Sequence, residues 1–523
     1  MRLLSSSAQQ FFFGAALFAA VLPAYAQLAP MDAQFAGLSA RTEMMAYQSR
    51  GGDMTAVQPL MSAAQNPDRA LAYRSLTHAM VVMSGSPWSP NAELPTALDF
   101  AIGAKLVGTG ENLMTRATFL FDAPAANDGP YRMKLDLLKP GGAVEASVEP
   151  GIVLGDVRGR KAGEIAGYVF DPSKSATPGL HLIRATLVDG HGTKLYEYYR
   201  SFFIVADLGP RVAELEKTLG ALPDASAAAA LSVRQVLETV QVSRQTYFGT
   251  GFQNLTGFVF ARMRAAGLGS TEAVDFDPAL KRAAESAAAL KDGHDPLVTG
   301  RGDLHMAYRS SFDGKLVPYR VFVPSNYDAK KKYPLVVLLH GAGGDETNFV
   351  EAYGGLWPKL AEQRGYILAS VSGRGPVTGY SKESGGEQDV LDVTDLVKTR
   401  YSIDPARVYL GGHSMGGAGT WRLGLTYATR WAGLIPIAGS SATVMTGYET
   451  LMKSGKQMPV MMVCGVKDAL VAVAGCRTAA ERAKSLSVPV KYAEYADGDH
   501  LSVAVMSVPD IFDWLDAQNK SPR

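Results

Sequence analysis

The sequence predicts an α/β protein whose C-terminal part forms a doubly wound, mostly parallel sheet, preceded by a β-sandwich-like domain and helical segments. From about residue 299 onward, short apolar runs alternate with helix-length segments, and many of these runs end in glycine. Such an alternation is typical of a parallel sheet that is buried on both faces. Between residues 91 and 207, apolar and polar residues alternate with period two, which indicates antiparallel strands.

The composition is that of an ordinary globular protein. The chain has 523 residues, of which 47% are hydrophobic and 19% are charged. At roughly 100–200 residues per domain, this length suggests two to four domains. The formal net charge of +1 predicts no electrostatic attraction to nucleic acid or to anionic membranes.

The first 26 residues have the pattern of a secretory signal peptide. The basic Arg2 precedes an apolar stretch from Phe11 to Leu22, which is followed by the small-residue site Ala24-Tyr25-Ala26. The stretch is shorter than the about 20 residues that span a bilayer. We therefore expect an exported protein, periplasmic or secreted, with no membrane insertion after the signal is cleaved.

Three segments are expected between the signal and the parallel sheet. Residues 27–90 and 208–298 are rich in helix formers and predict a helical N-terminal segment and a helical connecting segment. Residues 91–207 predict an Ig-like β-sandwich, because several short alternating strands are separated by turn residues. We expect this N-terminal half to have a structural or access role. Residues 299–523 then form the domain with the parallel sheet.

A serine between glycines follows one of the apolar runs of that sheet. The stretch Gly412-His413-Ser414-Met415-Gly416 fits the pattern G-x-S-x-G, with a predicted strand before it and a predicted helix after it. In a nucleophile elbow the flanking positions are small because two backbones pass closely, and the serine stands exposed on a strained turn. Ser414 is therefore the candidate nucleophile. His413 is expected to pack beside it or to shape the pocket.

A serine needs a base, and hydrolases of this kind carry serine, acid and histidine in that chain order. His500 is the one histidine after Ser414, and Asp468 follows another apolar run. We predict that His500 moves the proton and that Asp468 orients its ring. Asp497 and Asp499 are alternatives for the acid, but aspartates so close to His500 are more often turn residues.

The oxyanion hole needs two backbone N–H groups. One is predicted at Met415, directly after the nucleophile, and the other in the loop His340-Gly341-Ala342-Gly343-Gly344. Ala342 is our candidate donor, with Gly341 as the alternative. His340 is expected to orient this loop. No phosphate-loop motif and no metal-ligand spacing accompanies it, so we expect neither a cofactor nor a metal.

Further residues leave alternatives open. The glycine-rich stretch with Arg374, Tyr380 and Glu383 could line a substrate pocket or be a plain surface loop. The two tryptophans Trp357 and Trp421 could line the site but more often pack helices against a sheet. Cys464 and Cys476 could form a disulfide or remain two buried thiols, because spacing alone does not fix their geometry.

Residues 300–523 resemble an α/β-hydrolase of the feruloyl esterase and polyhydroxybutyrate depolymerase-like group. The resemblance rests on the stretches VPYRVFVPSNY, YPLVVLLHGAGGDETNF, YSIDPARVYLGGHSMGGAGTW, CGVKDALV and DGDH. Many esterases of this group carry leucine where this chain has His413. The resemblance implies a serine esterase that cleaves small or polymeric carboxylic esters through an acyl-enzyme.

Two other functions remain open. More distantly, the same domain resembles the catalytic part of prolyl-oligopeptidase-like peptidases, but the strand-rich stretch is too short for the β-propeller usual there. A non-catalytic binding protein on the same fold is the other alternative, because a fold does not guarantee a function.

Overall fold

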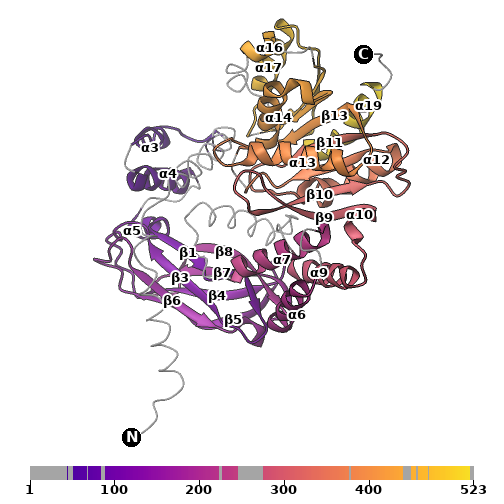
Figure 1. Cartoon of the computed structure of the whole chain (residues 1–523). Helices are drawn as coiled ribbons and strands as arrows, with labels where there is room; N and C mark the ends of the chain where they lie inside the picture. The colour runs from indigo at the N-terminus through magenta and orange to yellow at the C-terminus, as the bar shows by residue number, and fades with distance from the viewer. Residues whose placement is uncertain are drawn as a thin grey trace. The chain divides into compact units, whose positions relative to one another are not determined.

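The computed structural model describes most of the chain, which divides into two compact units (Figure 1). One unit is formed from residues 1–211 and 239–270, the other from residues 212–238 and 271–523. The predicted signal peptide lies outside the described residues. These are Met44, Tyr47, and residues 51–66, 69–83, 89–222, 227–244, 275–375, 379–439, 449–454, 458–468 and 470–518.

The first unit contains two sheets with one apolar core between them. Their strand orders are β1-β3-β6 and β2-β8-β7-β4-β5. The core joins Phe100 of one sheet with Leu135 and Leu187 of the other. In β4, buried residues alternate with more exposed ones, as the period-two pattern predicts. The strands are β1 (Leu98–Ile102), β2 (Leu106–Gly108), β3 (Leu113–Phe119), β4 (Tyr131–Leu138), β5 (Val144–Gly155), β6 (Ile165–Phe170), β7 (Gly179–Val188) and β8 (Lys194–Val205).

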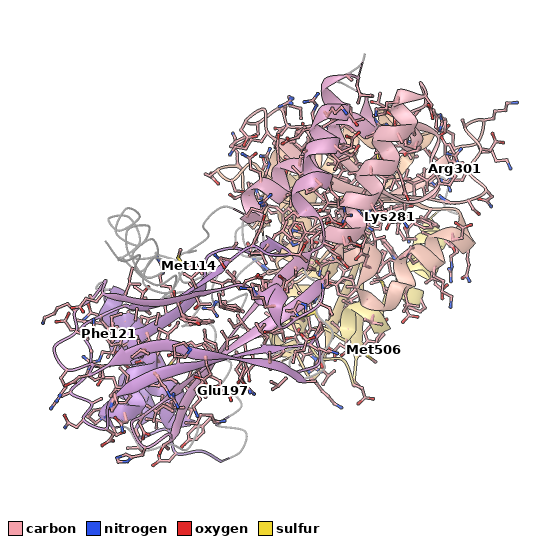
Figure 2. The ribbon with its side chains drawn as sticks, turned by 90° about the horizontal axis from the view of Figure 1, so that it is seen from below. Met114, Phe121, Glu197, Lys281, Arg301 and Met506 are labelled. Atoms are coloured by element: carbon pink, nitrogen blue, oxygen red, sulfur yellow. A yellow bond between two sulfur atoms is a disulfide. The ribbon has the colours of Figure 1, made fainter. Side chains whose placement is uncertain are left out.

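Most helices outside the second unit's sheet lie before β1 or after β8, and the segment after β8 is divided between the two units. Its residues 212–238 belong to the second unit and residues 239–270 to the first. In Figure 2, Met114 and Glu197 mark β3 and β8, and Lys281 marks α9. The helices are α3 (Val57–Ala63), α4 (Arg69–Met83), α5 (Pro90–Glu93), α6 (Leu208–Gly220), α7 (Ala228–Arg244), α9 (Phe276–Lys291) and α10 (Pro296–Thr299), with short 3-10 turns at η1 (Leu94–Ala97) and η2 (Pro172–Lys174).

The second unit is built on an eight-stranded sheet in the order β16-β15-β14-β13-β11-β12-β10-β9. The six strands from β16 to β12 in this order are parallel to their neighbours, whereas β10 pairs antiparallel with β12 and β9. This confirms the mostly parallel sheet. The strands are β9 (Gly302–Arg309), β10 (Leu316–Val323), β11 (Tyr333–Leu339), β12 (Ile367–Val371), β13 (Ile403–His413), β14 (Gly433–Ile437), β15 (Val460–Gly465) and β16 (Val490–Tyr495).

Helices cover both faces of this sheet, which is why its inner strands β11, β12 and β14 are buried at every position. Trp421 of α14 belongs to the core on one face, and Trp357 of α12 and Phe512 of α19 belong to the core on the other. Both tryptophans are fully buried, so they pack helices against the sheet. The remaining elements are α11 (Asn348–Glu351), η3 (Tyr353–Gly355), α12 (Leu356–Arg364), α13 (Gly386–Arg400), α14 (Met415–Thr426), η4 (Ala428–Arg430), α16 (Glu449–Ser454), α17 (Val473–Ser485), α18 (Val503–Met506) and α19 (Val508–Gln518).

A search of the described residues for helices that could span a membrane finds none of sufficient length and apolar character.

Candidate active site

The predicted site residues meet at one edge of the parallel sheet. Ser414 follows β13, Asp468 follows β15, and His500 follows β16. The loop that begins at His340 follows β11, the neighbour of β13 on the other side. Because parallel strands end at the same edge, residues that are up to 160 positions apart in the sequence lie together there.

Ser414 occupies a strained turn between β13 and α14. Its φ is 56° and its ψ is −114°, a backbone conformation that is costly for a residue with a side chain. The glycines on either side are needed for close packing. A Cβ at Gly416 would lie 2.0 Å from the carbonyl oxygen of Leu339, and one at Gly412 would lie 2.4 Å from the carbonyl oxygen of Gly416. The sequence pattern thus has the geometry of a nucleophile elbow.

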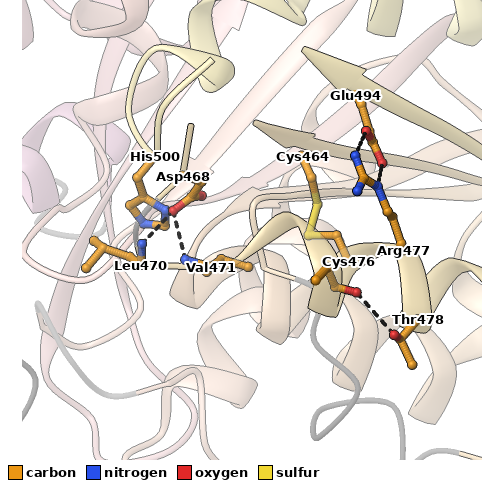
Figure 3. The surroundings of a disulfide bond; sticks show 10 residues. Cys464, Asp468, Leu470, Val471, Cys476, Arg477, Thr478, Glu494 and His500 are labelled. Atoms are coloured by element: carbon orange, nitrogen blue, oxygen red, sulfur yellow. Dashed lines mark hydrogen bonds and ion pairs between the residues drawn. A yellow bond between two sulfur atoms is a disulfide. The ribbon is translucent and has the colours of Figure 1, made fainter. Parts of the chain in front are cut away.

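The structure places His500 between Ser414 and Asp468. The His500 Nε2 lies 2.8 Å from the Ser414 Oγ, and the His500 Nδ1 lies 2.8 Å from the Asp468 Oδ2. The other carboxylate oxygen, Oδ1, accepts the backbone N–H groups of Leu470 and Val471 at 2.8 and 2.7 Å (Figure 3). Since an ionised carboxylate only accepts hydrogen bonds, Nδ1 carries the proton and Nε2 is free to accept the one on Ser414.

The two alternative acids have other partners. Asp497 forms an exposed ion pair with Lys467. Asp499 accepts the backbone N–H groups of Leu501 and Ser502 through its Oδ1, which makes it a turn residue directly beside His500. Asp468 is therefore the carboxylate that contacts the imidazole ring.

The predicted oxyanion loop lies against the nucleophile. A Cβ at Gly341 would be only 3.3 Å from the Cβ of Ser414, so the loop backbone passes directly beside the reacting side chain. The ring nitrogens of His340 lie 2.8 Å from the carbonyl oxygens of Gly341 and Ser372, which holds the start of the loop. Met415 is the first residue of α14. The choice of Ala342 over Gly341 as the second donor stays a prediction.

The three residues that the sequence singles out in the stretch after β12 have different environments in the structure. Tyr380 is fully buried, and its hydroxyl donates to the carbonyl oxygen of His340. It therefore supports the start of the predicted oxyanion loop. Arg374 is held by Asp389 and Asp313 at 2.8 and 2.9 Å. Glu383 is exposed. The sequence could not separate these roles, because burial depends on the loop's path over the sheet.

One group of described residues has the composition of a metal site, and it lies away from the triad. Asp303, His305 and Glu351 bring their ligand atoms within 4.8 Å of one another, near the β9 edge of the sheet. However, the Arg320 guanidinium donates to both carboxylates. Burial, with Arg320 and Arg282 nearby, lowers the pKa of His305 to about 2. The place of a cation is thus taken by an arginine.

Glu346, in the loop between β11 and α11, is a buried carboxyl group close to the site. Burial, reinforced by the charge of Asp345, raises its pKa to about 8. In the unfolded chain a glutamate ionises near pH 4.3. The folded state therefore holds this proton more tightly, and the resulting stability is complete below about pH 4.3 and is lost as the pH rises through about 8.

We therefore expect Glu346→Gln to reduce the loss of stability between pH 5 and pH 8.5. The wild-type protein should lose on the order of a few kcal/mol over this range through Glu346, and the variant should lose less. Urea unfolding followed by tryptophan fluorescence measures this, since four of the five tryptophans lie in the second unit. The matched control is Glu285→Gln on α9. Equal pH dependence in wild type and Glu346→Gln would contradict the expected role of Glu346.

Cys464 at the end of β15 and Cys476 on α17 form a disulfide, and both residues are fully buried. The bridge closes the loop that carries Asp468, Leu470 and Val471 (Figure 3). The sequence left this pairing open, and the structure selects the bridged alternative.

His413 does more than pack beside Ser414. It is buried, and both of its ring nitrogens have hydrogen-bonding partners, Tyr353 and the backbone of His500. No motif marks Tyr353, which lies 60 positions earlier in the chain. Two consecutive glycines follow it, Gly354 and Gly355. They are the one local sign in the sequence that the chain makes a tight turn here.

The strand order and the strained turn at Ser414 are those of the α/β-hydrolase fold, which the second unit therefore has. Residues 336–518 match the model of the Alpha/beta hydrolase family, which confirms the resemblance that the motifs indicate.

Parts of this chain are similar in sequence to three curated proteins. Dipeptidyl-peptidase 5 of Porphyromonas endodontalis is 24% identical over 50% of this chain and 44% of its own length. The bifunctional acetylxylan esterase/xylanase XynS20E of Neocallimastix patriciarum is 30% identical over 28% of this chain and 21% of its own length. Poly(3-hydroxyalkanoate) depolymerase C of Paucimonas lemoignei is 33% identical over 25% of this chain and 34% of its own length. The chain thus spans less than half the length of each of them.

Proposed function

We propose that this protein is an exported serine hydrolase that cleaves carboxylic esters through an acyl-enzyme. The observation that carries the proposal is the position of the His500 ring, 2.8 Å from the Ser414 Oγ and 2.8 Å from the Asp468 carboxylate. A nucleophile, a base and an orienting acid at such distances are the recognised requirements for activating a serine.

Each residue has a defined part in the proposed reaction. The Ser414 Oγ attacks the acyl carbon while the His500 Nε2 takes the hydroxyl proton, and Asp468 stabilises the imidazolium that forms. The backbone N–H groups of Met415 and Ala342 bind the oxyanion. His500 then gives its proton to the departing alcohol oxygen, and water enters by the reverse sequence to release the acid and restore Ser414.

The choice of esters over amides rests on two of the three relatives, which are named as an esterase and a depolymerase. The peptidase alternative is favoured by the match to a dipeptidyl-peptidase over half of this chain. Against it, the described part of residues 91–207 forms two sheets with a shared core and no repeated propeller blades.

Export is supported by the signal-like pattern of residues 1–26 and by the disulfide, since disulfides persist mainly in oxidising compartments. N-terminal sequencing of the mature protein tests it, and we expect the first residue to be Gln27. A cytosolic protein that retains residues 1–26 would contradict this part of the proposal.

Substrate profiling tests the reaction itself. The wild type and Ser414→Ala are compared on p-nitrophenyl esters from acetate to octanoate, on methyl ferulate and on a proline-based p-nitroanilide. We expect turnover of esters by the wild type and its loss in Ser414→Ala. Turnover of the amide with no ester preference would make the protein a peptidase. Folded wild type that neither turns over any substrate nor reacts with a fluorophosphonate would instead favour a binding protein.

A further inference from the structure

The imidazole of His413 is held at both nitrogens, directly behind the nucleophile. Its Nε2 lies 2.7 Å from the backbone carbonyl oxygen of His500, and its Nδ1 lies 3.0 Å from the Tyr353 hydroxyl oxygen. The rings of His413 and His500 also contact each other, with their centroids 4.9 Å apart. A residue of the elbow thus contacts the backbone of the proposed base.

The hydrogen-bond partners fix which nitrogen of His413 carries its proton. A carbonyl oxygen can only accept, so the His413 Nε2 must be the donor to His500. Nδ1 of the neutral ring is then an acceptor, and it receives the Tyr353 O–H. Burial and the neighbouring His500 lower the pKa of His413 to about 3. A neutral His413 adds no positive charge beside His500 when the latter becomes an imidazolium.

Tyr353 is held in place at a conformational cost. Its φ is 50°, and Gly354 and Gly355 after it also have positive φ values of 67° and 63°. A non-glycine residue in the left-handed region persists when its surroundings fix it, and such residues concentrate at functional sites. Here the strained turn carries a hydroxyl group that faces the Nδ1 of His413.

We propose that His413 is a positioning residue for the base, and that Tyr353 sets its tautomer so that Nε2–H holds the His500 carbonyl oxygen. The inference rests on the proposed function, because it gives His413 a role in the activity of Ser414 and His500. The inference adds a requirement to the three proposed triad residues, namely that the backbone of His500 is also held in position. The backbone of the base is held by the residue directly before the nucleophile, so both keep one relative position.

Three variants test the proposal. His413→Leu removes both hydrogen bonds but fills a similar volume, and His413→Gln places an amide donor near the former Nε2. Tyr353→Phe removes the group that sets the tautomer. The readouts are kcat and KM on the best p-nitrophenyl ester and the rate at which a fluorophosphonate labels Ser414.

The expected pattern separates positioning from packing. His413→Leu should lower kcat and the labelling rate by about 10- to 100-fold, as a displacement of the order of 1 Å does, with KM unchanged. His413→Gln should recover most of this loss. Tyr353→Phe should cause a smaller loss and should have no further effect when combined with His413→Leu, because the two residues act through one hydrogen-bond chain.

Different outcomes identify which proposal fails. If the wild type is labelled and His413→Leu reacts within twofold of it, or if the leucine and glutamine variants are equally slow, His413 is not a positioning residue. If the wild type is neither labelled nor active, the proposed function fails and the role of His413 fails with it. Should His413→Leu not fold, the comparison of His413→Gln and Tyr353→Phe with the wild type decides, and unchanged rates in Tyr353→Phe would overturn the proposal.

Discussion

Replacing Asp468 with asparagine is expected to lower kcat by about 10⁴, the size of the effect that loss of the orienting acid has in other serine hydrolases. The Asp468 Oδ2 accepts the hydrogen bond from the His500 Nδ1. An amide nitrogen in that place donates instead, and the imidazole then carries its proton on Nε2, where it can no longer accept the one on Ser414. The rate of p-nitrophenyl ester hydrolysis measures the loss.

The fold should survive this substitution. The Oδ1 of Asp468 accepts two backbone N–H groups, from Leu470 and Val471, and the carbonyl oxygen of an asparagine can accept both. We therefore expect KM and the melting temperature of Asp468→Asn to stay close to those of the wild type. This separates a change in the chemistry of the site from a collapse of the loop.

Two neighbouring aspartates supply matched controls. Asp497→Asn removes only an exposed ion pair with Lys467, and exposed pairs contribute little, so its kcat should match that of the wild type. Asp499→Asn alters a turn whose backbone N–H groups it accepts and should have a small effect. A nearly normal rate in Asp468→Asn with a large loss in Asp499→Asn would move the role of the acid to Asp499.

The sequence predicts that the residues of the proposed triad lie together because their positions depend on the order of the strands. Ser414, Asp468 and His500 each follow a strand that is recognisable as an apolar run, and parallel strands bring their carboxyl ends to one edge. The glycines at 412 and 416 are equally readable, because a close approach of backbones excludes any side chain there.

Contacts between loops cannot be predicted from the order of the strands. Tyr353 reaches His413 from a turn 60 positions earlier, and neither periodicity nor a motif describes that contact. The burial of Tyr380 and of Glu346 depends on how the loops after β12 and β11 cover the sheet edge. Their polarity in the sequence suggests exposure, whereas the structure encloses both.

The disulfide gives the second large expected effect. Replacing both Cys464 and Cys476 with alanine should lower the stability of the second unit by ~3 kcal/mol, the value that chain entropy gives for closing a loop of about this length. The residues are 12 positions apart, and the loop between them carries Asp468, the proposed acid of the site. Unfolding in urea, followed by tryptophan fluorescence, measures the loss.

Activity should fall in the same double variant, because the bridge and the acid belong to one short loop. Asp468 is four positions after Cys464 and is anchored to Leu470 and Val471 within the closed loop. Greater freedom of this loop loosens the hydrogen bond to His500, and we expect kcat to fall by about 10-fold. Thr478→Ala on the same helix removes only an exposed hydroxyl bonded to Ala474 and serves as the control.

Thiol counting in denaturant decides whether the bridge exists in the purified protein, and two free thiols in non-reduced wild type would contradict it. Because both sulfur atoms are fully buried, a reductant reaches them only when the loop opens, so reduction of the native protein should be slow and should accelerate in mild urea. Loss of activity that follows the rate of reduction would tie the bridge to the position of Asp468. A double variant that is less stable but keeps its kcat would instead limit the bridge to holding the loop against unfolding, and Asp468 would be positioned by its two backbone hydrogen bonds alone.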